Sequence, residues 1–175
     1  GLDNKLMLKP EVPLDLNELQ DLHNSGDATH PVWEVRTGSA LDGNHGSNQI
    51  TGSEGRDFLY GHEGDDQLTG GAGRDTFIYN AKADNGHDVI KDFNVGEDKI
   101  ALTDVLETKD INLKAPGWKP TSEIQNAQWD DAAHKLSYDT TDAAGKIYHN
   151  SITFEGMTQS YGSVDDFLKD NTHII

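Results

Sequence analysis

The amino-acid sequence predicts an all-β protein organised around a parallel β-roll, with a β-hairpin and short helices as caps. Three observations support this fold class. Residues 43–78 form four nine-residue units without a gap, glycine holds the first and fourth positions of every unit, and an apolar residue holds the eighth. A flexible glycine-rich linker has no reason to place an apolar residue every nine positions, so the period indicates a folded structure.

Each unit divides into a turn and a short strand. Glycine lets the backbone take positive φ and turn tightly at the start of the unit. The last three positions are expected to be extended, with the middle side chain pointing inward. These inward residues are Ile50, Leu59, Leu68 and Phe77. Two units make one coil, so each turn should face the turn two units later.

The sixth position of each unit supplies a candidate calcium ligand. The residues there are Asn48, Asp57, Asp66 and Asp75. Carboxylates beside bare carbonyls offer the hard oxygen ligands that calcium prefers, although some of these Asp residues could instead form Asx-turns. One turn cannot surround an ion but two stacked turns can, so Asp57 and Asp75 are expected to share an ion. Turn carbonyls should complete the shells, namely those of Gly52, Glu54, Gly61, Glu63, Gly70 and Ala72.

These units resemble the calcium-binding nonapeptide of RTX proteins, Gly-Gly-x-Gly-x-Asp-x-apolar-x. The fourth unit alone matches in full, because Asn44, Ser53 and His62 replace the second glycine in the others. Ser and His adopt a left-handed backbone less readily than Asn. The neutral Asn48 should make a weaker site.

The segments after the repeats, residues 87–93 and 96–102, resemble the stretch that closes the roll in RTX proteases, lipases and adhesins. This resemblance implies that Asp88 is a calcium ligand, with Asp92 and Asp98 as further candidates.

The composition is strongly acidic. The 175 residues carry a formal net charge of -17, and 34% of them are hydrophobic. This charge argues against nucleic acid and anionic membranes as partners, and self-repulsion should oppose folding until cations bind. The chain has no cysteine, and no apolar run is long enough to span a membrane. We therefore expect several bound calcium ions, a monomeric chain and no membrane insertion.

Three regions are expected along the chain. They are an N-terminal flanking or capping segment over 1–36, the calcium-binding roll over 37–102, and a C-terminal capping and secretion-signal region over 103–175. In the first, Asp15 can cap a helix that carries Leu16, Leu19 and Leu22. In the last, alternation around 136–138 and 148–154 predicts a β-hairpin. Ser163 should cap a short helix whose apolar face is Val164, Phe167 and Leu168.

The two outer faces of the roll are expected to differ. The outward positions of units two and four are Phe58, Tyr60, Thr76 and Ile78. Those of units one and three are Gln49, Thr51, Gln67 and Thr69. We expect the flanking residues 1–36 or 103–175 to cover the apolar face. Equal burial of both faces would mean that the strand register is wrong.

Sequence motifs give no support for catalysis. His62-Glu63 begins like a zinc-protease motif, but Asp66 stands where the second histidine must be. The chain has neither a Gly-x-Ser-x-Gly nucleophile elbow nor a P-loop. A non-enzymatic role is expected.

The resemblance implies a C-terminal module of a type I-secreted protein, most closely a large bacterial adhesin at the cell surface or outside the cell. Such a module stays unfolded at cytosolic calcium and folds outside. Its partners would be calcium, the type I secretion machinery during export, and a carbohydrate or cell-surface ligand. One alternative is the module of a secreted protease, lipase or alginate epimerase. Another is a polysaccharide-binding module, which an exposed aromatic strip on the roll would favour.

Overall fold

A computed structural model describes residues 38–103 and 124–172 of the chain. The helix predicted after Asp15 lies outside these residues. The described part is mostly β, as predicted, and contains one short helix. The strands are β1 (Ala40–Asp42), β2 (Gln49–Thr51), β3 (Phe58–Tyr60), β4 (Gln67–Thr69), β5 (Thr76–Asn80), β6 (His87–Ile90), β7 (Lys99–Thr103), β8 (Gln125–Asp130), β9 (Lys135–Thr141) and β10 (Ile147–Phe154). The helix is α2 (Val164–Asn171).

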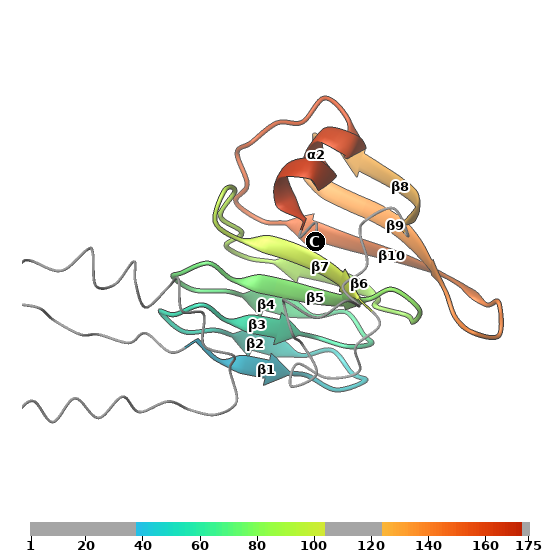
Figure 1. The fold of residues 1–175 in the computed structure, drawn as a ribbon, viewed down its shortest axis with the longest axis horizontal. Coiled ribbons are helices and arrows are strands. Elements are labelled where there is room, and N and C mark those ends of the chain that lie inside the picture. Colours follow the sequence, from blue (N-terminus) through green and yellow to red (C-terminus); the bar gives the residue numbers. More distant parts are fainter. Residues whose placement is uncertain (1–37, 104–123, 173–175) are drawn as a thin grey trace, which may run out of the picture.

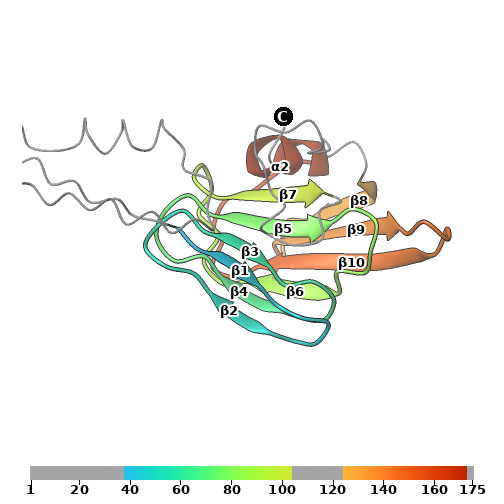
Figure 2. The ribbon, with the colours of Figure 1, turned by 60° about the horizontal axis from the view of Figure 1, so that its bottom comes forward.

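Strands β1 to β7 alternate between two sheets as the chain advances. One sheet has the order β1-β3-β5-β7, and the other has the order β2-β4-β6-β10-β9-β8. Strands β1 to β7 pair in parallel within their sheets, so that Leu59 lies opposite Phe77 and Ile50 lies opposite Leu68. Each unit of the repeat thus pairs with the unit two positions later, as the nine-residue period predicts. Figures 1 and 2 show the two stacks of short strands side by side.

The inward residues of the repeats lie between the two sheets. Leu59, Leu68 and Phe77 are completely buried, whereas Leu41 and Ile50 are partly buried against the same core. The predicted inward position is therefore correct for Ile50, Leu59, Leu68 and Phe77.

The outer faces of the two sheets are buried to different extents. Phe58, Tyr60, Thr76 and Ile78 are at most 3% exposed. Gln49, Thr51 and Gln67 are exposed, and Thr69 is half-buried. This unequal burial agrees with the predicted strand register. Of the flanking residues expected to cover the apolar face, 1–36 or 103–175, residues 1–37 and 104–123 lie outside the described ranges, so the covering role stays a prediction.

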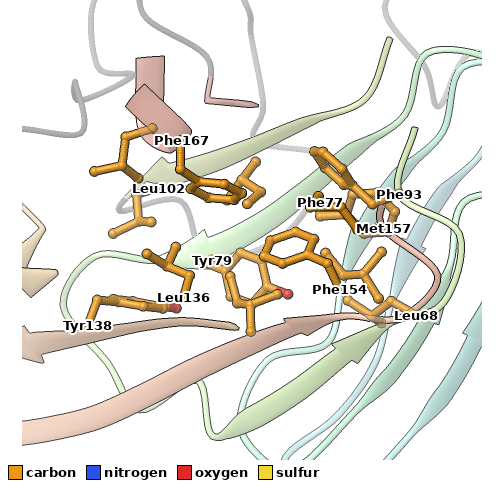
Figure 3. Close-up of a cluster of buried hydrophobic side chains, with 14 of the residues drawn as sticks. Leu68, Phe77, Tyr79, Phe93, Leu102, Leu136, Tyr138, Phe154, Met157 and Phe167 are labelled. Carbon is orange, nitrogen blue, oxygen red and sulfur yellow. The ribbon is translucent and has the colours of Figure 1, made fainter. Parts of the chain in front are cut away.

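The predicted C-terminal hairpin is formed by β9 and β10, which pair antiparallel. The sequence did not indicate that β10 also pairs in parallel with β6, so that Ile152 lies opposite Asp88. The hairpin thereby extends one sheet of the repeat region. It also brings Leu136, Tyr138 and Phe154 into the same core as Leu68 and Phe77, as Figure 3 shows.

Strand β8 was not predicted, because Gln125–Asp130 is mostly polar and lacks apolar alternation. It is the outer strand of its sheet and pairs antiparallel with β9, with a register shift between Gln125 and Gln128. Its one large apolar side chain, Trp129, packs against the core. Tertiary contact therefore forms a strand where local patterning indicates none.

Helix α2 begins as predicted. The Ser163 hydroxyl accepts a hydrogen bond from the Asp166 N–H at 3.1 Å, which satisfies one of the free donors of the first turn. Phe167 is fully buried and stacks on Trp129 with ring centroids 4.2 Å apart. Thr172 bridges to Ile100 of β7 just after the helix ends. Within residues 38–103 and 124–172, no helix has the length and hydropathy needed to cross a membrane.

Candidate calcium sites

The position-six carboxylates form a ladder along one edge of the stacked turns. One oxygen of Asp75, Oδ1, accepts a hydrogen bond from the Asp57 N–H at 2.9 Å, across 18 residues. The Oδ1 atom of Asp57 accepts from the Ser39 N–H in the same way. Asp98 continues the ladder, because its Oδ1 accepts from the Asp75 N–H at 2.9 Å. Turns two units apart therefore face each other.

A second ladder runs along the other edge. The Asn48 N–H donates to Oδ1 of Asp66 at 2.7 Å, and the Asp66 N–H donates to Oδ1 of Asp88 at 2.8 Å. Asp88 is only 2% exposed and lies in β6. The structure thus places Asp88 in the row of the position-six residues, and its role as a calcium ligand, which the resemblance implied, stays a prediction. The hydrogen bonds of both ladders were not predicted, although the 18-residue recurrence of Asp was their signal.

Two of these carboxylates each present an oxygen that no protein group satisfies. Asp66 and Asp75 are each 1% exposed, and the Oδ2 atom of each is buried without a hydrogen-bond partner. An unpaired buried carboxylate oxygen is costly, so such an atom calls for an explanation. Each of these Oδ2 atoms lies against the glycine at the first position of its own unit. A Cβ built on Gly61 would be 2.0 Å from Asp66 Oδ2, and one on Gly70 would be 2.3 Å from Asp75 Oδ2. Glycine therefore keeps the space beside the free oxygen open.

Backbone carbonyls lie close to the corresponding spaces of the first and second units, beside Asn48 and Asp57. A Cβ built on Gly52 would meet the Gly70 carbonyl oxygen at 2.1 Å, and one on Gly43 would meet the Gly61 carbonyl oxygen at 2.6 Å. These two predicted ligands therefore face the preceding turn of their own edge. Glu54, Glu63 and Ala72 lie at exposed positions of their turns. The ligand role of their carbonyls stays a prediction.

The donor set fits calcium. Buried carboxylate oxygens and nearby carbonyl oxygens are the hard ligands that calcium takes in six- to eight-fold coordination. In the part of the chain that the structure describes, no three Asp, Glu or His side chains converge on one point as a metal site. An ion here would therefore need backbone carbonyls in its shell. Asp66 and Asp75 would hold it through their unpartnered Oδ2 atoms.

Burial makes these carboxylates hard to ionise without a cation. It raises the pKa of Asp75 to about 7, with a further contribution from the neighbouring Asp98 and Asp57 carboxylates. Burial also raises the pKa of Asp88 to about 8 and that of Asp98 to about 6, and it shifts the pKa of Asp66 upward. A divalent cation among these groups would offset both the loss of solvation and the mutual repulsion.

Asp92 and Asp98 hold the turn of the fourth unit. Asp92 accepts hydrogen bonds from the N–H groups of Gly70 and Gly71, both at 2.8 Å. Asp98 uses its second oxygen to accept from the Asn94 N–H at 2.8 Å. Both oxygens of each side chain are thus engaged by backbone donors, so hydrogen bonds to the turns account for both residues.

Asn85 is a residue of this region that sequence reasoning missed. It is 1% exposed, and its Oδ1 accepts from the Asn80 N–H at 2.8 Å while its Nδ2 donates to the Asn80 carbonyl at 2.9 Å. Its own N–H donates to Oδ1 of Asn150 at 2.8 Å, which links this turn to β10. The amide group thus supplies both a donor and an acceptor inside the turn that precedes Asp88.

Comparison with known proteins bears on the repeats. The family model for the RTX calcium-binding nonapeptide repeat matches residues 42–77 in four copies. No curated protein matches the chain by sequence. Among solved structures, the chain is similar to the solution structure of the AlgE6R3 subunit from the Azotobacter vinelandii mannuronan C5-epimerase. The two are 24% identical over 79% of this chain and 78% of that chain, with a TM-score of 0.23. The family match coincides with the periodic glycines, the aspartate ladders and the paired strands, and residues 42–77 are thus four RTX calcium-binding nonapeptide repeats.

Proposed function

We propose that this chain is a calcium-dependent folding module in which ions held between stacked turns stabilise a parallel β-roll. The observation that carries the proposal is the pair of buried, unpartnered Oδ2 atoms of Asp66 and Asp75. Extracellular calcium modules have dissociation constants of about 10⁻⁴ to 10⁻³ M. At ten times that constant each site contributes about 1.4 kcal/mol, so two sites, one at Asp66 and one at Asp75, would contribute about 3 kcal/mol. This is a large fraction of the stability of a marginal domain, which is about 5 kcal/mol.

Circular dichroism of the full chain in chelator and then in calcium tests this proposal. The chain should have little strand signal in chelator, because 31 acidic residues repel one another with only 14 basic residues to offset them. Calcium should restore the signal, and magnesium at the same concentration is the ionic-strength control. A full strand signal in chelator that calcium leaves unchanged would contradict the proposal.

The division into three regions belongs to the same proposal. Residues 37–102 would form the roll, with 1–36 as an N-terminal capping segment and 103–175 as a C-terminal capping and secretion-signal region. The capping role of the last region is supported by its hairpin and helix. Phe154 and Phe167 are buried in the same core as Phe77 and Leu68.

The cellular role that fits these features best is that of a module in a type I-secreted RTX protein, and we infer a large bacterial adhesin as the parent. An acidic chain that folds only in calcium suits passage through a narrow exporter, followed by folding outside the cell. The module would then act outside the cell or at its surface and would not be an enzyme. Its partners would be calcium, the secretion machinery and a carbohydrate or cell-surface ligand of the parent protein.

The export signal is proposed to lie in residues 161–175. The supporting feature is helix α2, whose eight residues are too few for a stable isolated helix. Before calcium binds, its apolar residues would be uncovered and accessible to an exporter. Deletion of 161–175 should abolish export from a strain that carries the cognate type I system. Phe154→Ala is the matched control, because it weakens the folded core but leaves residues 161–175 unchanged, and it should be exported normally. Normal export of the deleted chain would place the signal elsewhere.

The polysaccharide-binding alternative lacks its expected feature in the described residues. It needs an exposed aromatic strip on the roll, but Phe58 and Tyr60 are 3% and 2% exposed. The one large hydrophobic side chain that is exposed in the described ranges is Ile147, in the C-terminal hairpin. We therefore do not propose this function for the outer face of the repeats.

A further inference from the structure

The turns of the four repeats fall into two backbone classes. In the third and fourth units, the second and fourth positions all have positive φ: His62 at 72°, Gly64 at 117°, Gly71 at 92° and Gly73 at 117°. In the first and second units, none of the corresponding residues has positive φ; these are Asn44, Gly46, Ser53 and Gly55. The same nine-residue period thus contains two different turns.

In the first class, which we term closed, the second-position N–H of the turn donates a hydrogen bond to the position-six side chain of the same unit. In the first unit, the Asn44 N–H donates to Oδ1 of Asn48 at 2.7 Å. In the second unit, the Ser53 N–H donates to Oδ2 of Asp57. The Ser53 hydroxyl also lies 3.0 Å from Oδ1 and 3.1 Å from Oδ2 of Asp57. Both oxygens of Asp57 are therefore engaged by donors of the protein.

The second class, which we term open, leaves a carboxylate oxygen free. Oδ2 of Asp66 and Oδ2 of Asp75 have no protein partner, although both residues are 99% buried. In the fourth unit, the second-position N–H is directed elsewhere, because Gly71 donates to Asp92 at 2.8 Å. A positive φ at the second position therefore accompanies the free oxygen in both open turns.

The residue at the second position explains the difference. Gly71 takes positive φ freely, whereas a residue with a Cβ does so at a cost. His62 is held in that conformation by its neighbours: its ring stacks on Tyr60 at 3.7 Å, and its Nε2 lies 3.3 Å from Oδ1 of Asp42. Ser53 instead has a hydroxyl that favours the closed turn by bonding to Asp57.

We propose that calcium is held by the open turns of the third and fourth units, through Asp66 and Asp75. In the first and second units, a backbone N–H of the turn bonds to the position-six side chain instead, and the turn forms without an ion. This inference rests on the proposed function and refines it. It also separates Asp57 from Asp75, which the sequence pattern had assigned to one shared ion. An ion that used Asp57 would have to compete with the Ser53 donors.

Isothermal titration of the full chain with calcium tests the assignment. Asp66→Asn and Asp75→Asn should each lose one ion per chain or bind it at least tenfold more weakly. Asp57→Asn is the matched control, because it sits at the same repeat position, and it should keep the number of ions and their affinity within twofold. If Asp57→Asn loses as much calcium binding as Asp75→Asn, the assignment is wrong. If the unsubstituted chain binds no calcium, the proposed function itself fails.

A gain-of-binding variant covers the case in which an Asp variant does not fold. Ser53→Gly gives the second unit the complete Gly-Gly-x-Gly-x-Asp pattern and removes the hydroxyl that engages Asp57. It should add one ion per chain or raise the affinity at least tenfold. Asn44→Gly is its control, because the turn becomes equally free but Asn48 supplies no carboxylate, and binding should not change. No gain with Ser53→Gly, or an equal gain with both variants, would overturn the proposal.

Discussion

Gly70→Ala is a direct test of whether the space beside Asp75 holds an ion. The added Cβ would lie 2.3 Å from Asp75 Oδ2 and 3.0 Å from its Cγ. Ordinary contact begins at 3.4 Å, so the carboxylate oxygen would have to move by the difference, 3.4 − 2.3 = 1.1 Å. Gly70 does not have positive φ, so alanine introduces no backbone strain there. The substitution therefore perturbs the space beside Asp75 Oδ2 and little else.

The expected loss of stability follows from the coordination geometry. Calcium–oxygen distances are about 2.3 to 2.6 Å, so a displacement of about 1 Å removes Asp75 from the shell. At a calcium concentration of ten times the dissociation constant, loss of one site lowers the free energy of unfolding by about 1.4 kcal/mol. Urea unfolding at that concentration, followed by circular dichroism, measures the difference. Gly61→Ala should have the same effect on the other edge, because its Cβ would lie 2.0 Å from Asp66 Oδ2.

Gly162→Ala is the matched control for this experiment. Gly162 does not have positive φ, and a Cβ there would meet nothing within 4 Å. Its free energy of unfolding in calcium should equal that of the unsubstituted chain. Equal values for Gly70→Ala and Gly162→Ala would refute the reasoning, because they would show that the space beside Asp75 contributes nothing in calcium.

Two further predictions concern the C-terminal region. Phe167→Ala should lower the free energy of unfolding in calcium by about 3 to 5 kcal/mol, because the ring is fully buried and stacks on Trp129 at 4.2 Å. A loss below about 1 kcal/mol in urea unfolding would show that α2 does not share the core. Hydrogen bonds from Ser160, from the Tyr161 N–H and from Trp129 lower the pKa of Asp131 to about 2. An unfolded Asp has a pKa of about 3.9, so this stabilisation is complete above that pH and disappears as the pH falls through about 2. Asp131→Asn should therefore be less stable than the unsubstituted chain at pH 5 and equally stable near pH 2. A difference in urea midpoint that stays constant over this range would contradict the stabilising role given to the Asp131 hydrogen bonds.

The sequence by itself determined the repeat region. The nine-residue period places Leu59, Leu68 and Phe77 at the inward position of successive strands, and the two-unit coil follows from it. These features are local and repeat in register, so one unit predicts the next. The hairpin and the Ser163 cap were also predictable, since alternation and capping depend on residues close together in the chain.

Only the tertiary structure decided how distant segments complete the fold and which turns are open. Strand β8 is polar and forms because it pairs with β9, and β10 joins the repeat sheet through β6, more than 50 residues earlier. The backbone of His62 depends in the same way on contacts with Tyr60 and Asp42. Ser53 and His62 both depart from glycine at the same repeat position, yet their turns differ. The reason is that a left-handed residue with a Cβ needs compensating contacts, and such contacts exist only after the chain has folded.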